Sequence, residues 1–76
     1  MSERVVLDAK GLKCPLPVLR ARKAIKALRP GDVLVVLATD PGAGPDFESF
    51  CRVTGHRLLD VRDDAGALVI EIEKAA

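Results

Sequence analysis

The sequence predicts a two-layer α+β sandwich with the element order βαβαββ, in which two helices cover one face of a four-stranded mixed sheet. Three observations lead to this prediction. Apolar residues recur at helical spacing soon after a short β-branched run. The continuous apolar run VLVVLA is typical of a strand in the middle of a sheet. A later stretch alternates apolar and polar residues, as a strand with one buried face does.

The first part of the chain is expected to form a strand, a helix and a second strand. Residues 4–8 (RVVLD) are rich in β-branched side chains and predict the first strand. Residues 15–28 carry apolar side chains three or four positions apart, which indicates a helix. The pair Pro30 and Gly31 should end that helix, since neither residue continues a helix well. Residues 33–38 form the second strand.

A glycine- and proline-rich segment, residues 40–45, is predicted to be a loop. Asp46 then suits the N-cap of a short second helix, because its side chain can accept hydrogen bonds from the first free backbone N–H groups. Gly55 should close this helix. The apolar side of the helix carries Phe47, Phe50 and Cys51. Cys51 is therefore assigned to core packing.

The last part of the chain is predicted to be a hairpin. Residues 57–62 form the third strand, residues 63–66 the turn, and residues 68–73 the fourth strand with Leu68, Ile70 and Ile72 pointing inward. Crossovers of the usual right hand place both helices on one sheet face. The fourth strand should pair antiparallel with the third.

Length and composition indicate a single domain that covers residues 1–76. The apolar fraction of 49% is that of a folded protein. No apolar run is long enough to span a membrane, and the first residues lack the apolar stretch of a signal peptide. We therefore expect a cytoplasmic monomer with two free thiols, no metal site and no cofactor.

The net charge of +1 hides a strong asymmetry along the chain. Residues 9–31 contain seven basic residues and no acidic one, whereas the rest of the chain after residue 31 has nine acidic residues against four basic ones. This basic segment is either a docking surface for an anionic partner or simply the solvated face of a helix. The candidate docking residues are Lys10, Arg20, Arg22, Lys23 and Lys26.

Cys14 is the candidate functional residue, because it lies at the predicted junction between the first loop and the first helix. Proline is favoured at the first helical position, so Pro15 there would make Cys14 the N-cap. Its sulfur would lie beside unpaired backbone N–H groups, with basic residues nearby, and its pKa would be lowered. The residues expected to support it are Gly11, which lets the loop turn, Lys13, Pro15 and Pro17.

The remaining residues restrict the chemistry of this thiol. A redox pair of the Cys-x-x-Cys type is excluded because Pro17 stands where the second cysteine would be. His56 is the only histidine and is interpreted as a solvated turn residue. A thiol that accepts a sulfur atom and passes it on, as a persulfide, needs neither a second cysteine nor a histidine.

The segments LDAKGLKCPLPVLRARKAIKAL, GDVLVVLATDPG and DFESFCRVTGHRL resemble the TusA-like (SirA-like) family of sulfur carriers over almost the whole chain. The family's Cys-Pro-x-Pro signature corresponds to Cys14 through Pro17. The resemblance implies a persulfide on Cys14, received from a cysteine desulfurase or rhodanese-like donor and passed to a DsrE-like acceptor. It implies a sulfurtransferase-type carrier rather than a stand-alone catalyst. The pathways served include tRNA thiolation, molybdenum cofactor assembly and sulfur oxidation.

Two alternatives without sulfur transfer stay open at this point. The basic segment would suit a small RNA-binding module, since phosphate contacts require only exposed lysine and arginine. Direct nucleic-acid binding is disfavoured because the only aromatic residues of the Phe, Trp and Tyr types, Phe47 and Phe50, are expected in the core. A regulator that acts by protein contact alone is the other alternative. Formation of a persulfide on Cys14 separates a carrier from both.

Overall fold

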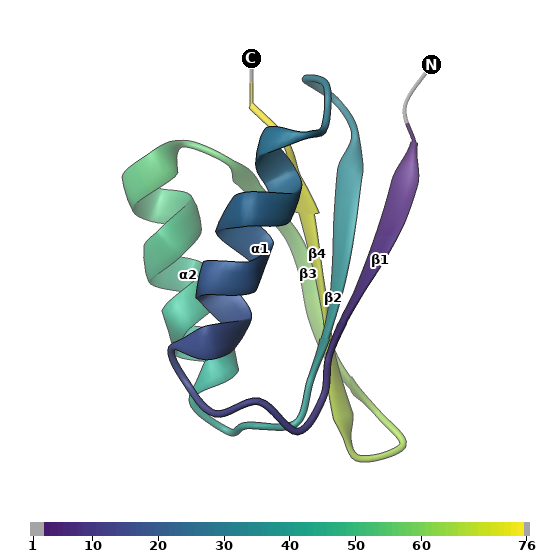
Figure 1. Ribbon diagram of the computed structural model, residues 1–76, viewed down its shortest axis with the longest axis vertical. Coiled ribbons are helices and arrows are strands. Elements are labelled where there is room, and N and C mark those ends of the chain that lie inside the picture. The colour runs from purple at the N-terminus through teal and green to yellow at the C-terminus, as the bar shows by residue number, and fades with distance from the viewer. Residues whose placement is uncertain (1–2, 76) are drawn as a thin grey trace.

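The computed structural model describes residues 3–75 and has the predicted βαβαββ order (Figure 1). Both helices lie on one face of a four-stranded mixed sheet, which confirms the two-layer prediction. Neither helix in this part of the chain is long and apolar enough to cross a membrane. The elements are β1 (Arg4–Ala9), α1 (Leu16–Lys26), β2 (Val33–Ala38), α2 (Ala43–Thr54), β3 (Arg57–Asp64) and β4 (Ala67–Glu73).

The sheet has the strand order β1-β2-β4-β3. β1 runs parallel to β2, with α1 as the crossover, and β4 pairs antiparallel with both β2 and β3. The last residues of the parallel strands, Ala9 and Ala38, are register partners. Because the two strands end side by side, the loops that follow them emerge at the same end of the sheet. This topology places the functional site.

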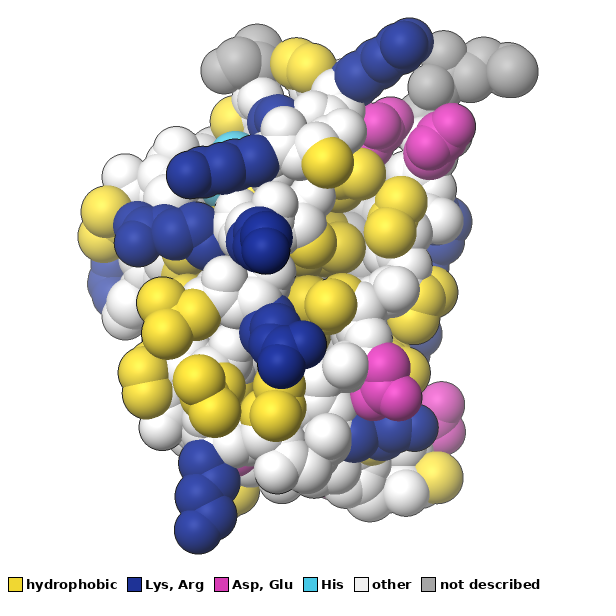
Figure 2. Space-filling view, in the orientation of Figure 1, with side chains coloured by type: hydrophobic (Ala, Val, Ile, Leu, Met, Phe, Trp, Pro, Cys, Tyr) yellow, Lys and Arg dark blue, Asp and Glu magenta, His cyan; other side chains and the backbone are white. Residues whose placement is uncertain are grey.

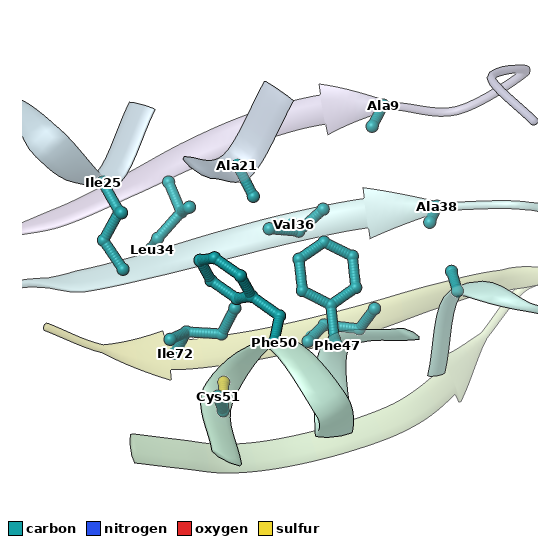
Figure 3. Close-up of a cluster of buried hydrophobic side chains, with 12 residues drawn as sticks. Ala9, Ala21, Ile25, Leu34, Val36, Ala38, Phe47, Phe50, Cys51 and Ile72 are labelled. Atoms are coloured by element: carbon teal, nitrogen blue, oxygen red, sulfur yellow. The ribbon is translucent and has the colours of Figure 1, made fainter. Parts of the chain in front are cut away.

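The main core lies between the sheet and the helices. Figure 3 shows side chains of α1 and α2 packed onto those of β2 and β4. The rings of Phe47 and Phe50 meet edge to face, with centroids 6.2 Å apart. Cys51 is only 5% exposed within this cluster, so its predicted packing role is confirmed. The inward-facing Ile70 and Ile72 of β4 are fully buried, as their alternation predicts.

A second, smaller apolar cluster covers the outer face of the sheet. It contains Val33, Val35 and Val69. The guanidinium of Arg4 reaches from β1 across β2 to Glu71 on β4, at 2.9 Å, and Arg62 reaches the same carboxylate from β3, at 2.6 Å. The aliphatic part of an arginine side chain can cover apolar surface while its charge remains paired. β2 is therefore buried on both faces, as its continuous apolar run predicts.

The first helix is shorter than predicted. α1 ends at Lys26 with Ala27 as its C-cap, well before Pro30 and Gly31. The connection to β2 is instead closed by Asp32, whose carboxylate accepts hydrogen bonds from the backbone N–H groups of Arg29 and Glu3, each at 2.9 Å. These two hydrogen bonds lower the pKa of Asp32. Asp32 thus ties the segment after α1 to the residue that precedes β1.

Two other boundaries differ from the prediction. α2 begins at Ala43, so Asp46 lies in its first turn and is not the N-cap. Gly55 does end α2, in the left-handed conformation expected of a C-cap glycine, with φ 83°. The β3–β4 turn is shorter than the predicted turn of residues 63–66, because only Ala65 and Gly66 separate the two strands. Both have positive φ, of 53° and 85°, as a two-residue hairpin turn of type I′ requires.

Candidate functional site

The site is built from the two loops that follow the parallel strands β1 and β2. Both loops lie at the end of the sheet where α1 and α2 begin (Figure 1). The first loop carries Cys14, and the second carries Asp40 and Gly42. Residues that are 26 positions apart in sequence therefore meet at one edge of the molecule.

Asp40 fastens the two loops to each other. Its Oδ2 accepts a hydrogen bond from the backbone N–H of Cys14 at 2.9 Å, and its Oδ1 accepts one from the backbone N–H of Gly42 at 2.8 Å. These bonds lower the pKa of Asp40. The bond from Gly42 lies within the second loop, whereas the N–H of Gly11 donates to Oγ1 of Thr39 at 2.9 Å and adds a second link between the loops. The position of Cys14 is thus fixed by the second loop.

The prediction that Cys14 is the N-cap of the first helix is wrong. α1 begins at Leu16, Pro15 occupies the cap position, and the peptide bond between Cys14 and Pro15 is cis. The N–H of Leu16 donates to the carbonyl of Lys13 at 2.8 Å, which closes a turn ahead of the helix. Since Cys14 lies inside this turn, its side chain is placed by contacts with the second loop and α2.

The Cys14 sulfur lies against Gly42. A Cβ atom built on Gly42 would lie 3.4 Å from Sγ of Cys14 and 3.3 Å from Oδ1 of Asp40. Gly42 has a φ of −79°, which any residue adopts, so the requirement for glycine is one of space. Cys14 is half-buried and packs against the edge of the core.

We expect Gly42→Ala to slow reactions at the Cys14 sulfur, because the added methyl group occupies the space beside Sγ. Alkylation of Cys14 by iodoacetamide should become several-fold slower, while the far-ultraviolet circular dichroism stays unchanged. Gly44→Ala is the matched control: it lies in the same first turn of α2, and a Cβ there meets no atom within 4 Å. Equal alkylation rates in the two variants would contradict the steric role of Gly42.

The acid–base environment of Cys14 is opposite to the one expected from the sequence. Its pKa is raised from 9.0 to about 12, first because the thiol hydrogen-bonds to Asp46, then because of burial and of the negative charges of Asp40 and Asp46. The basic residue that precedes it, Lys13, is exposed and does not offset two carboxylates at close range. The two carboxylates and the partial burial therefore favour the thiol form of Cys14 over the thiolate.

The supporting residues have different roles from one another. Gly11 has a φ of +81°, so it supplies the sharp turn that was predicted. Lys13 and Pro15 are exposed beside Cys14. Pro17 is fully buried at the start of α1 and belongs to the core. In the Cys-Pro-x-Pro segment, Pro15 is thus exposed to solvent, whereas Pro17 is buried.

Two grooves flank α1 near Cys14. A groove of about 310 Å³ separates α1 from α2, and a larger one of about 620 Å³ lies between α1 and the edge strand β1. The first is lined by Pro15, Val18, Arg22, Asp46, Ser49, Phe50, Val53 and Thr54. The second is lined by Leu7, Leu16, Leu19, Arg20, Lys23 and Ala24. Cys14 comes directly before Pro15, which lines the first groove, and Leu16, which lines the second.

The five candidate docking residues are all exposed, and basic side chains are spread over the helical face in Figure 2. They do not form one stripe. Arg22 faces the groove toward α2, whereas Arg20 and Lys23 face the groove toward β1. Lys10 lies 3.9 Å from the carboxylate of Asp8, and Lys26 is exposed near the end of α1.

His56 does not take part in the site. It follows the end of α2, whereas Cys14 adjoins the start of that helix, so the length of α2 separates them. The ring is half-buried against Phe50, its Nδ1 accepts the N–H of Ala75 at 3.0 Å, and burial lowers its pKa. The prediction of a solvated turn residue is therefore wrong. Within residues 3–75 no group of metal-ligating side chains is present.

Sequence reasoning missed three residues of the site: Asp40, Gly42 and Asp46. Each lies in the segment that was predicted to be a plain loop or a helix cap. The parallel arrangement of the first two strands contained the missing signal, because it requires the loop after β2 to approach the loop after β1. A carboxylate or a glycine in that second loop was therefore a candidate neighbour of Cys14.

Comparison with known proteins gives a consistent result. Residues 5–74 match the family Sulfurtransferase TusA. A Neisseria meningitidis serogroup A protein is 57% identical over 67 residues, which cover 88% of this chain and 90% of that one. The sulfur carrier protein TusA of Allochromatium vinosum is 46% identical over 91% of each chain. The crystal structure of a SirA-like protein from Desulfitobacterium hafniense superimposes with a TM-score of 0.81 at 26% identity, covering 95% of this chain and 99% of that chain.

Proposed function

Because this chain belongs to the TusA family of sulfur carriers, we propose that it carries a sulfane sulfur as a persulfide on Cys14. The observation that supports this assignment is the contrast between its two cysteines. Cys14 lies half-buried where two loops meet at the end of the sheet, whereas Cys51 is closed inside the core. A terminal sulfur on Cys14 is the one that a partner's cysteine can approach. The two free thiols suit a cytoplasmic carrier.

The proposed transfer requires no external oxidant or reductant. The thiol of Cys14 releases its proton to solvent, the resulting thiolate attacks the outer sulfur of a persulfide on the donor protein, and a new S–S bond forms. The S–S bond within the donor breaks, and its electron pair leaves on the donor's cysteine sulfur, which takes up a proton. One persulfide and one thiol thus become one thiol and one persulfide. The reverse reaction with an acceptor's thiolate passes the sulfur on.

The partners are part of the proposal. A cysteine desulfurase or a rhodanese-like protein would supply the sulfur, and a DsrE-like protein would accept it, for tRNA thiolation, molybdenum cofactor assembly or sulfur oxidation. Exposed cations line the two grooves beside α1, Arg22 in one and Arg20 and Lys23 in the other, which suits the docking of an acidic partner surface. Such docking should weaken as salt rises, because exposed charges are screened over about 8–10 Å at ordinary ionic strength.

A loading assay tests the proposal. Incubation with a cysteine desulfurase and cysteine should add the mass of one sulfur atom, removable by a reducing agent, and the addition should map to Cys14. Cys51→Ala should keep it and Cys14→Ser should lose it completely. Loading at raised salt, and of the double variant with Arg22 and Lys26 changed to Glu, should be slower. A sulfur atom found on Cys51, or retained by Cys14→Ser, contradicts the carrier role.

The RNA-binding alternative receives no support from the aromatic residues. Phe47 is fully buried and Phe50 is 7% exposed, and the chain has no tyrosine or tryptophan. Single-stranded RNA is usually held by bases stacked on exposed aromatic rings. Such a platform is missing here, so the exposed cations of α1 are better assigned to contact with a protein.

A further inference from the structure

The two edges of the sheet differ in how open they are to a further strand. The strand order places β1 at one edge and β3 at the other (Figure 1). β3 has a register shift between Leu58 and Asp60, and most of its residues are charged. Bulges and charges of this kind keep an edge strand from pairing with other chains. β1 pairs with β2 without a break and has three apolar residues in its middle, Val5, Val6 and Leu7, so it is the open edge.

The free backbone groups of β1 belong to every second residue. The N–H of Val33 in β2 donates to the carbonyl of Glu3 at 2.8 Å, so the carbonyl of Glu3 faces β2. Backbone groups of successive residues in a strand point to opposite edges, and those of Arg4, Val6 and Asp8 therefore point away from β2. All three residues are exposed, Val6 by 63%. Their N–H and C=O groups are thus available to a further strand.

The groove between α1 and β1 adjoins this open edge. Leu7 of β1 and Leu16 and Leu19 of α1 form its apolar part, and the two leucines of α1 are 45% and 51% exposed. Its charged residues, Arg20 and Lys23, are both basic, and within residues 3–75 neither forms an ion pair. Hydrophobic and basic side chains lie next to each other on the helical face in Figure 2. A strand added beside β1 would turn every second side chain toward this groove.

We infer that the edge of β1 and the groove beside it form a docking site for an extended, acidic segment of a partner protein, which joins the sheet as a further strand. The backbone of the segment pairs with β1, its aliphatic side chains contact the exposed leucines of α1, and its carboxylates pair with Arg20 and Lys23. The site adjoins the functional cysteine, because β1 leads into the loop that carries Cys14. The inference gives the chemistry of a docking partner and in this respect rests on the proposed function.

A second copy of the chain is a poorer occupant of this edge. Two β1 strands paired about a two-fold axis would keep all helices on one face and bring the α1 helices of both copies toward each other. Arg20 and Lys23 of one copy would then face the same cations of the other, and facing like charges cost free energy. An acidic segment meets the same cations with opposite charge. Charge complementarity thus favours a partner segment over self-association at this edge.

Peptide binding to the intact protein tests the inference. The probe is a fluorescein-labelled decapeptide with threonine at every second position and valine and glutamate in turn at the others. In the control peptide lysine replaces glutamate. Fluorescence anisotropy should detect binding of the acidic peptide only. In the complex, the amide hydrogens of Arg4, Val6 and Asp8 should exchange with solvent about tenfold more slowly or more, because they gain hydrogen-bond acceptors. Equal binding of both peptides, or slowed exchange in β3 instead of β1, overturns the inference.

Two variants separate the backbone contribution from that of charge. Val6→Pro removes an N–H that faces the open edge and leaves the hydrogen bonds to β2 in place, whereas Val6→Thr keeps this N–H and is the matched control. We expect Val6→Pro to lose the peptide and Val6→Thr to retain it. The double variant Arg20→Glu, Lys23→Glu should bind it about tenfold more weakly or less, and Arg52→Glu, which changes an exposed residue of α2, should bind it like the unaltered protein. With the fold checked by circular dichroism, full binding by either Val6→Pro or the double variant overturns the inference.

Sulfur loading and the state of the free protein complete the test. If the peptide binds at β1 while no sulfur loads on Cys14, the docking site stands and the carrier function is rejected. If sulfur loads on Cys14 and the acidic peptide does not bind, the carrier function stands and the docking site is rejected. Sedimentation equilibrium should show a monomer in the absence of peptide. A dimer that Val6→Pro abolishes would assign the edge to a second copy and overturn the inference.

Discussion

Replacing Phe47 with alanine should remove a large part of the free energy of unfolding of this protein. Phe47 is the largest fully buried side chain and packs between α2 and the sheet (Figure 3). Truncation of a buried phenylalanine costs about 3–5 kcal/mol, and whole domains are stable by only about 5–15 kcal/mol. A chain of 76 residues has a small core, so one lost ring removes a large part of its stability.

Urea unfolding followed by circular dichroism measures this effect. The midpoint for Phe47→Ala should fall sharply, whereas Val53→Ala should barely move it, because Val53 is 81% exposed on the same helix. If the two variants unfolded at similar urea concentrations, the cluster around Phe47 would not be the main source of stability.

Replacing Asp40 with asparagine should loosen the site while the rest of the fold persists. The amide nitrogen of asparagine cannot accept a hydrogen bond, so one of the two backbone N–H groups that Asp40 engages loses its acceptor, and the other loses a charged one. The amide hydrogens of Cys14 and Gly42 should then exchange with solvent about tenfold faster or more, as measured by nuclear magnetic resonance.

The effect of acid on Asp40 has a definite sign. Its pKa is lower in the folded protein than its ordinary value of 3.8, so its stabilising contribution is fully present above that value and is lost as the pH falls through the lowered pKa. Asp40→Asn should lack this step. Asp63→Asn, an exposed acid in β3, is the control and should keep both the protected amides and the acid response. Protected amides in Asp40→Asn would show that the loops are held by other contacts.

The fold could be predicted because its signals are local. The apolar run of β2, the alternation in β4 and the positions of Phe47 and Cys51 each indicate their own burial, and all were confirmed. The position of Cys14 ahead of α1 was missed because it depends on the loop that follows β2. Cys14 is tied to Asp40, which is 26 positions away, and this contact, not the dipole of α1, decides where the sulfur lies.

The protonation state of Cys14 could not be predicted for the same reason. Counting charges along the chain places Lys10 and Lys13 near the cysteine and suggests a lowered pKa. The folded chain instead brings Asp40 and Asp46 to it from the second loop and α2. Sequence neighbours of a reactive group are thus a poor guide to its electrostatics when the sheet contains a parallel pair, whose connections return distant loops to the same edge.

The outer face of the sheet bears on how this molecule meets others. Arg4 and Arg62 both reach Glu71, which is the register partner of Val35 and so lies on the same face as the outer valine cluster. A small sheet open on one side would otherwise offer an apolar plane to a second copy of the chain, the usual start of self-association. Here the paired charges of Arg4, Arg62 and Glu71 lie on that face, beside Val6, which is 63% exposed. A second copy that stacked on this face would have to remove water from these charged groups, which costs free energy and opposes self-association there.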